Sequence, residues 1–262
     1  MASFEIEPRG PFSLAAAARF IGGWPPGRAH ANEDEVRLRF LVDDWSGPAT
    51  VVLTQPGETV QGTVEADNEP RAIEQAKRIV SLDHDGNDYP AVGERDPIVG
   101  ELLKQSGYLR PVLFHSPYEA AAWSVLSARA QHAQAVKLRD ALGETFPAPQ
   151  DLLNVKEGPP ANKLARLHGV AQAALEGKLD REPLLAQDSN EAYTQLQELP
   201  GIGPFYAGLI LIRAVGPTDL APKGEPRLDR AVQARYGQPV ETVSEAWRPF
   251  RTWVSVLMRA ST

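Results

Sequence analysis

Cysteine is absent from the 262-residue chain, so the protein can form no disulfide bond, no thiolate zinc site, no cysteine-ligated iron–sulfur cluster and no cysteine nucleophile. Long apolar stretches are absent too, since no segment approaches the roughly 18 uninterrupted apolar residues of a membrane span. The first residues, Met1 to Glu5, lack the basic segment and the apolar core of a signal peptide. These absences predict a cytoplasmic protein that does not associate with membranes.

Positive charge is also scarce, because the formal net charge of the chain is −7. The deficit is uneven: residues 1–110 contain 11 Lys and Arg against 18 Asp and Glu, whereas residues 111–262 contain 16 of each. Binding to the phosphate backbone of nucleic acid is driven largely by Lys and Arg. The neutral second half is compatible with a local basic face, so the total charge does not exclude nucleic acid as a partner.

The first 110 residues mix helical and strand periodicity. Alternating apolar residues and turn-type sequences predict strands at 36–42, 50–53 and 59–64. One helical pattern starts with the capping residue Ser13 and ends at Gly22-Gly23, and a second covers 70–80. The order helix, strands, helix predicts an α+β domain with an antiparallel sheet rather than a parallel one.

From Ser116 onward the pattern is almost wholly helical. Ser116, Pro117 and Glu119 supply a cap, a proline at the first helical position and an acid at the third, which predicts a helix that runs to about residue 142. Further helices are predicted at 149–155, 161–175, 189–198, 204–215, 227–236 and 243–259. We therefore predict an α+β domain over 1–110, whose end packs with the C-terminal helices, and a mainly α-helical domain over 111–262.

The most specific motif is a turn between two predicted helices, Leu199-Pro200-Gly201-Ile202-Gly203-Pro204. Two glycines around one aliphatic residue let the backbone turn sharply and expose consecutive N–H groups beside the start of the next helix. Such a turn can bind a phosphate oxygen. A plain helix–helix turn is the alternative, because Pro-Gly and Gly-Pro occur in turns of every kind.

Residues after the turn favour the first interpretation. A helical segment at 207–215 and a loop at 216–224 lead to Glu225, which lies 22 residues after Gly203 (225 − 203 = 22), and Arg230 follows five residues later. In this arrangement the sequence resembles the helix-hairpin-helix DNA glycosylase superfamily and, within it, the 3-methyladenine DNA glycosylase II branch. Glu225 stands where the family typically has Asp.

Other segments carry the same resemblance, at 114–127, 162–167 and 247–253. Before residue 110 the similarity is weaker and rests on residues 10–14 and on the order of the elements. The resemblance thus covers the helical half of the chain best.

The resemblance implies an enzyme that rotates a damaged nucleotide out of the duplex and hydrolyses its N-glycosidic bond. Breaking this bond builds positive charge on the sugar, which a fixed carboxylate can stabilise. Glu225 is the catalytic candidate, and Asp229, one helical turn on, is the alternative carboxylate. Because an alkylated purine is cationic, aromatic side chains can select it by cation–π contact. The candidate walls of the base pocket are Trp123, Phe205 and Tyr206.

DNA contacts follow from the same resemblance. Arg129 takes the family position of a side chain that is inserted into the vacated base stack. The other DNA-binding candidates are Gly201, Ile202, Gly203, Lys163 and Arg230. In the family, carbonyls of the hairpin hold a monovalent cation, which here implies a Na⁺ or K⁺ ion at Gln197, Leu199 and Ile202. No further cofactor is implied.

Strand-cleaving members of the superfamily carry a lysine two residues after the second hairpin glycine, where this chain has Phe205. The resemblance therefore implies a monofunctional glycosylase without lyase activity. We expect it to act as a monomer in base excision repair, on double-stranded DNA that contains alkylated purines such as 3-methyladenine.

Alternatives remain for the acid and for the function. An acid before Pro226 is also a common helix start, where its charge favours the helix dipole. The change from Asp to Glu supports a second hypothesis, a DNA-damage binding protein without efficient catalysis, and a third is a glycosylase for a different base lesion. His132 and His168 are interpreted as ordinary helix residues, and no residues have metal-ligand spacing.

Overall fold

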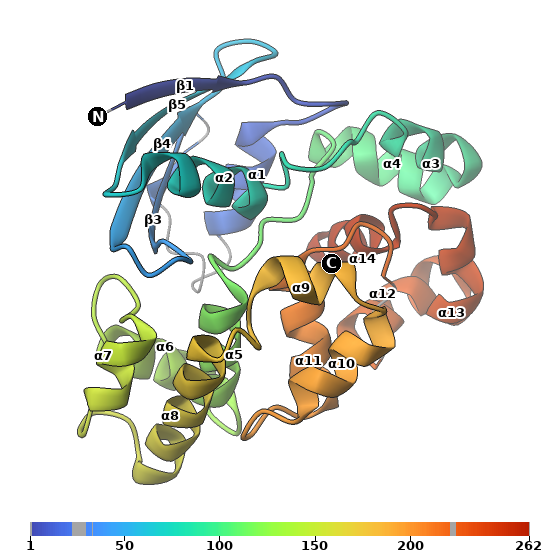
Figure 1. The fold of residues 1–262 in the computed structure, drawn as a ribbon. Helices are drawn as coiled ribbons and strands as arrows, with labels where there is room; N and C mark the ends of the chain where they lie inside the picture. The colour runs from blue at the N-terminus through green and yellow to red at the C-terminus, as the bar shows by residue number, and fades with distance from the viewer. Residues whose placement is uncertain (1, 23–29, 33, 221–223, 262) are drawn as a thin grey trace.

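The computed structural model describes residues 2–22, 30–32, 34–220 and 224–261, in which an antiparallel sheet precedes a set of helices (Figure 1). The sheet has five strands in the order β1-β5-β4-β3-β2. Their bounds are β1 (Ala2–Ile6), β2 (His30–Ala31), β3 (Glu35–Leu41), β4 (Pro48–Thr54) and β5 (Val60–Glu65). The three predicted strands correspond to β3, β4 and β5. Strand β1 escapes prediction because it is a short edge strand in which only Ile6 is buried, so its apolar alternation is weak.

One face of the sheet is buried against two helices, α1 (Leu14–Gly22) and α2 (Glu69–Ile79). Alternate residues such as Val36, Leu38 and Phe40 point into this core. Helix α1 begins after Ser13, as predicted, and the Ser13 Oγ accepts a hydrogen bond from the Ala16 amide at 3.1 Å. The predicted antiparallel sheet and its flanking helices are confirmed.

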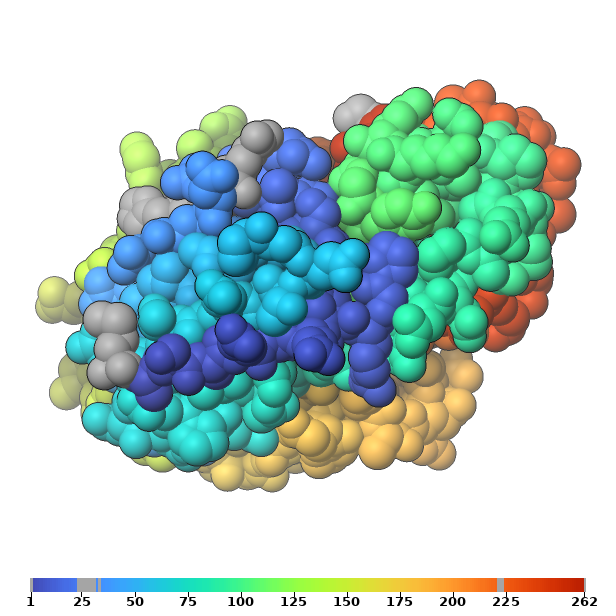
Figure 2. Space-filling model, turned by 90° about the horizontal axis from the view of Figure 1, so that it is seen from above, coloured from blue at the N-terminus to red at the C-terminus, as the bar shows by residue number. Residues whose placement is uncertain are grey.

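Two helices that the sequence does not predict, α3 (Tyr89–Arg95) and α4 (Pro97–Ser106), lie over the C-terminal helices (Figure 2). Glycines and prolines are typical of turns, and because both segments contain them the sequence does not predict helices there. Gly93 and Gly100 mark a close crossing instead, because a Cβ on Gly100 would lie 2.6 Å from the carbonyl oxygen of Gly93. Asp96 anchors the crossing from between the helices: its carboxylate accepts hydrogen bonds from the Trp247 indole at 2.9 Å and the Tyr236 hydroxyl at 2.8 Å.

The remaining helices form two lobes. The bounds of the first lobe are α5 (Pro117–Ser127), α6 (His132–Asp140), α7 (Pro149–Asn154), α8 (Ala161–Leu175), α9 (Arg181–Ala186), α10 (Ser189–Gln197), α11 (Pro204–Ile210) and the π-helix η2 (Leu211–Val215). The second comprises α12 (Pro226–Tyr236), α13 (Val240–Val243), the 3-10 helix η3 (Ser244–Trp247) and α14 (Arg251–Ala260), and it shares a core with α3 and α4.

Two of the predicted helices are interrupted in the structure. The helix expected from 116 to 142 is interrupted at 128–131, between α5 and α6, and the helix expected from 243 to 259 is divided at 248–250. Short breaks of this kind leave the apolar periodicity on both sides intact, which is why the sequence does not reveal them. The fold class is α+β, as predicted. No helix of the described residues is long and apolar enough to cross a membrane.

Candidate active site

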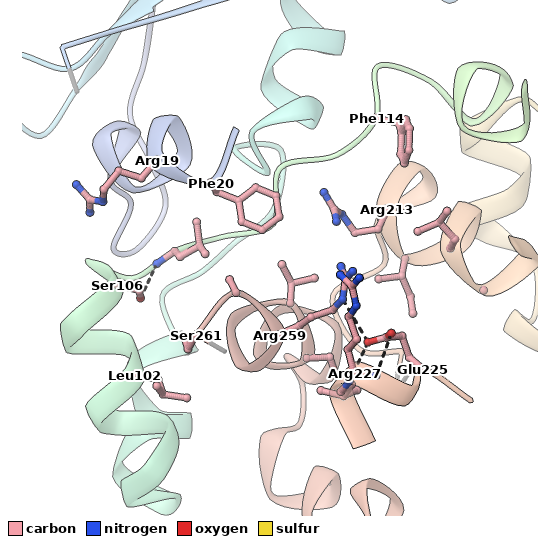
Figure 3. A pocket seen from close by; sticks show the side chains of 18 of the residues that line it. Arg19, Phe20, Leu102, Ser106, Phe114, Arg213, Glu225, Arg227, Arg259 and Ser261 are labelled. Atoms are coloured by element: carbon pink, nitrogen blue, oxygen red, sulfur yellow. Dashed lines mark hydrogen bonds and ion pairs between the residues drawn. The ribbon is translucent and has the colours of Figure 1, made fainter. Parts of the chain in front are cut away.

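A cleft of about 1160 Å³ lies where the sheet domain and the two helical lobes meet, and it is lined from α1, α4, α5, α6, α11, η2, α12 and α14. Figure 3 shows Glu225 and Arg227 on one side of this cleft and Arg19 and Phe20 of α1 on the other. Among the described residues of the lining, Glu225 carries the one carboxylate. The first catalytic candidate is thus placed in the cleft.

Glu225 caps helix α12 from an extended conformation. Its two carboxylate oxygens accept hydrogen bonds from the amides of Arg227 at 3.2 Å and Leu228 at 2.8 Å. The Arg259 Nε lies 3.3 Å from the Glu225 Oε2, and the Glu225 side chain is 19% exposed. Glu225 therefore both caps α12 and lines the cleft.

Arg259 is a site residue that the sequence does not predict. It comes from α14, the last helix of the chain, and 34 residues separate it from Glu225 (259 − 225 = 34). Periodicity within one helix cannot show which residue of another helix it faces, so no local signal was available.

Asp229, the alternative carboxylate, is exposed and is not among the residues that line the described cleft. Its pKa is raised, first by partial burial and then by the charges of Glu241 and Glu225. The geometry gives no support to Asp229 as the catalytic acid.

The predicted hairpin joins α10 to α11. Gly201 has a φ of +87°, and a Cβ at this position would lie 2.8 Å from the Arg166 side chain, so the turn requires glycine. Buried Ile202 anchors the turn, and its amide donates to the Leu199 carbonyl at 3.1 Å. Gly203 then caps α11 in an extended conformation. Within the described residues no acceptor pairs with the amides of Gly201 and Gly203, which suits an anion site.

Arg129 lies in the interruption between α5 and α6, where it is exposed and has a φ of +54°. Side chains other than glycine seldom adopt this left-handed conformation, so the loop holds Arg129 in a strained position. Backbone strain of this kind is common at functional sites.

Lys163 of α8 holds this loop. Its ammonium donates to three carbonyls at the end of α5, those of Val125 at 2.8 Å, Leu126 at 2.9 Å and Ala128 at 2.8 Å. Burial and the nearby charge of Arg166 lower the pKa of Lys163. All three ammonium donors are used within the protein, so the prediction that Lys163 contacts DNA phosphate is not supported by the geometry; the residue caps α5 instead.

The three aromatic candidates come together in the cleft lining. Trp123 is buried at the back, whereas the Phe205 side chain, from the first turn of α11, is 49% exposed. The Tyr206 hydroxyl accepts a hydrogen bond from the Ser127 Oγ at 3.3 Å. His132, interpreted above as an ordinary helix residue, also lines the cleft and packs edge-on against Trp123, with ring centroids 5.8 Å apart.

Basic side chains flank these features. Arg227 and Arg230 are both exposed on α12, and Arg227 alone of the two lines the cleft. Arg166, which the sequence does not predict as a site residue, is exposed, and its side chain packs against Gly201 beside the hairpin amides. No cluster of metal-ligating side chains is found in the part of the chain that the structure describes.

No model of a known protein family matches the chain. The chain is 27% identical over 186 residues to the DNA-3-methyladenine glycosylase of Bacillus subtilis (strain 168), a match that spans 59% of this chain and 61% of that protein. The chain thus covers less than two thirds of the length of this curated relative.

Solved structures share the fold over nearly the whole chain. The 3-methyladenine DNA-glycosylase from Archaeoglobus fulgidus superposes with a TM-score of 0.71 at 22% identity, over 99% of this chain and 97% of that one. The apo 8-oxoguanine glycosylase/lyase of Clostridium acetobutylicum gives a TM-score of 0.70 at 16% identity, over 99% and 95% of the two chains. The fold is that of the helix-hairpin-helix DNA glycosylases, and the sequence resembles their 3-methyladenine DNA glycosylase branch.

Proposed function

We propose that the protein is a monofunctional DNA glycosylase that excises alkylated purines from double-stranded DNA in base excision repair. The observation that carries the proposal is the Glu225 carboxylate, which lies at the start of α12 in an aromatic-walled cleft. The hairpin directly precedes α11 and the loop of Arg129 follows α5, and both of these helices line the same cleft. The name of the Bacillus subtilis relative supports the same activity.

Each part has a physical task in this reaction. A base within a duplex is inaccessible, so the nucleotide has to rotate into the cleft, and Arg129 fills the space that it leaves. The amides of Gly201 and Gly203 hold a phosphate of the bound strand, and Ile202 between them anchors the turn through its own amide. Trp123, Phe205 and Tyr206 stack against the extruded base.

Glu225 acts on the sugar. As the bond between base and sugar breaks, positive charge develops at C1′, and a fixed carboxylate stabilises it. The amides of Arg227 and Leu228 and the ion pair with Arg259 hold the carboxylate in place. The carboxylate also orients the water that attacks C1′.

Several features of the proposal follow from the residues around this site. A lyase needs an amine that forms a Schiff base with the sugar, and no lysine lines the described part of the cleft, where Phe205 occupies the relevant position. Carbonyl oxygens are ligands of the kind that binds Na⁺ or K⁺, so we also propose that such an ion binds at Gln197, Leu199 and Ile202 and rigidifies the hairpin. We further propose that the protein acts as a monomer within the cytoplasm.

Abasic-site formation tests the function directly. The substrates are duplexes that carry one 7-methylguanine, 3-methyladenine or 1,N6-ethenoadenine, and the proteins are the wild type, Glu225→Gln and Glu225→Asp. We expect base release from at least one lesion by the wild type and a loss on the order of 100-fold or more in Glu225→Gln, which keeps the side-chain length and removes the charge. Gel analysis without heat or alkali also reports strand cleavage, which we expect to be absent.

A DNA-damage binding protein is the competing function, and the Glu at position 225 is the observation that favours it. Under that alternative the wild type binds damaged duplexes but releases no base. Release that is unchanged in Glu225→Gln would remove Glu225 from the mechanism, whereas release that increases in Glu225→Asp would show that the longer side chain limits catalysis.

A further inference from the structure

The cleft beside Glu225 concentrates positive charge. Among the described residues that line it, Glu225 is the one acid, while five arginines contribute guanidinium groups: Arg19, Arg213, Arg227, Arg235 and Arg259. The whole chain has fewer basic than acidic residues, 27 Lys and Arg against 34 Asp and Glu, so the overall composition does not explain this excess. The cleft is a positive site in an acidic protein.

Two of these arginines, Arg259 and Arg213, interact electrostatically with each other. Arg259 is paired with Glu225 and so already counters its charge. Arg213 is 5% exposed, stacks its guanidinium on the Phe20 ring at 4.9 Å and donates to the Val112 carbonyl at 2.8 Å. Burial, together with the charge of Arg259, lowers the pKa of Arg213 to about 9, so it still carries its charge at neutral pH. In Figure 3 both side chains point into the cleft.

Alkylated purines fall into two electrostatic classes. Methylation at N3 of adenine or N7 of guanine makes the base in DNA cationic, whereas an etheno bridge between N1 and N6 of adenine leaves it neutral. A cationic base departs as a neutral molecule, and surrounding guanidinium groups repel it before it departs. A neutral base departs with negative charge on its ring, which the same groups stabilise in the transition state.

We propose that the arginine-lined cleft selects neutral alkylated purines over cationic ones. This inference rests on the proposed glycosylase function and names its substrate class. Aromatic walls serve a neutral purine equally well, because stacking needs only a flat ring surface.

The chemical step balances as a hydrolysis. The bond between C1′ and the base nitrogen breaks, and both of its electrons go to the base. Water adds to C1′, and the proton that the water loses balances the one that the departing base takes up. The arginines face the charge that develops on the base, while Glu225 faces the charge on the sugar.

The test compares the two classes in one protein. Single-turnover rates of base release are measured on duplexes with 1,N6-ethenoadenine or 7-methylguanine, and each rate is divided by the spontaneous loss of the same base from the same duplex. We expect the larger enhancement for 1,N6-ethenoadenine. In Arg259→Gln we expect this enhancement to fall on the order of 100-fold, and that for 7-methylguanine to stay unchanged or rise.

Two further variants keep the test decisive. Arg227→Gln alters an exposed residue of the cleft and replaces Arg259→Gln in the test if that variant does not fold. Loss of a phosphate contact would slow the release of both bases alike. The ratio of the two enhancements therefore isolates the effect of charge in the cleft. Arg37→Gln, on the sheet away from the cleft, is the matched control and should leave the ratio unchanged.

An equal or larger enhancement for 7-methylguanine in the wild type overturns the inference and leaves the glycosylase function intact. A parallel loss for both lesions in Arg259→Gln also overturns it, because Arg259 would then act only by holding Glu225. Failure to release any lesion, with duplex binding retained, refutes the proposed function itself and the inference with it.

Discussion

At the scale of single residues, Glu225 is both the cap of α12 and the candidate catalytic carboxylate. The extra methylene of Glu makes it a weaker helix cap than Asp in general. In this chain both carboxylate oxygens nevertheless reach amides of the first turn of α12, and one of them also meets Arg259. Two amide donors from α12 and an ion pair from α14 hold the longer side chain, and a fixed carboxylate is what stabilisation of the sugar cation requires.

Arg129 supports a prediction that separates its side chain from its backbone. Replacing it with glycine relieves the strain of its positive φ while removing the side chain, so any loss of activity comes from the missing wedge. We expect Arg129→Gly to slow base release from a fully paired duplex about tenfold, since the unstacking energy is then not offset. Single-turnover kinetics measure this effect.

Arg129→Met is the matched control, because it keeps the length of the side chain and loses only the charge. A wedge that acts by filling space retains most of its activity in this variant. Wild-type rates in Arg129→Gly would show that another side chain fills the stack, and the exposed Phe205 would be the next candidate.

At the scale of elements, the break between α5 and α6 depends on a contact from a third helix. The ammonium of Lys163, on α8, binds the last carbonyls of α5 and leaves residues 128–131 as a short loop. Lys163 is thus a positioning residue for Arg129 rather than a phosphate contact.

Replacing Lys163 with methionine tests this role. Lys163→Met leaves three carbonyls without their charged donor, so we expect a loss of about 1–2 kcal/mol in the free energy of unfolding and slower base release. In the Arg129→Gly background the same change should slow base release no further, because the loop then has no side chain to position. Lys178→Met, which alters an exposed lysine paired with Glu176, is the control and should change neither quantity. Equal slowing by Lys163→Met in both backgrounds would mean that Lys163 acts independently of the wedge.

Local chemistry predicted many of these elements, and packing decided the rest. The capping sequence at Ser116 and the alternation in β3 and β4 are written into neighbouring residues, and both appear as expected. Helices α3 and α4 were missed because their glycines serve a helix crossing, which depends on a partner helix. For the same reason Glu225 and the hairpin were found from their spacing, whereas Arg259 and Arg166 were not.

At the scale of the whole molecule, Arg110 joins the sheet domain to the C-terminal lobe. Its buried guanidinium donates to the carbonyls of Arg9 at 2.7 Å and Pro11 at 3.0 Å, and it stacks over the Trp253 ring at 5.0 Å. Burial lowers the pKa of Arg110 to about 10. A single side chain thus helps to set the position of the sheet domain beside the lobe that carries Glu225.

The distribution of charge over the molecule limits how it can hold DNA. The excess of acid belongs to residues 1–110, and the exposed arginines near the hairpin, the loop of Arg129 and α12 belong to the neutral half. The hairpin itself offers amides, which displace few counterions. Binding should therefore depend on salt less steeply than in proteins that cover DNA with lysine and arginine.

With Arg129 assigned to the base stack, three exposed arginines are the candidates for phosphate contacts: Arg166, Arg227 and Arg230. Each neutralised phosphate contributes about −0.9 to the slope of log K against log salt, so full engagement predicts a slope of about −2.7. Fluorescence anisotropy with the Glu225→Gln protein and a lesion duplex measures this slope without turnover. We expect Arg166→Gln to reduce its magnitude by about 0.9, because Arg166 lies against Gly201 of the hairpin, and Arg37→Gln on the sheet to leave it unchanged. A slope that changes in Arg37→Gln but not in Arg166→Gln would place the DNA on the sheet domain, although that part of the chain carries the excess of acidic residues.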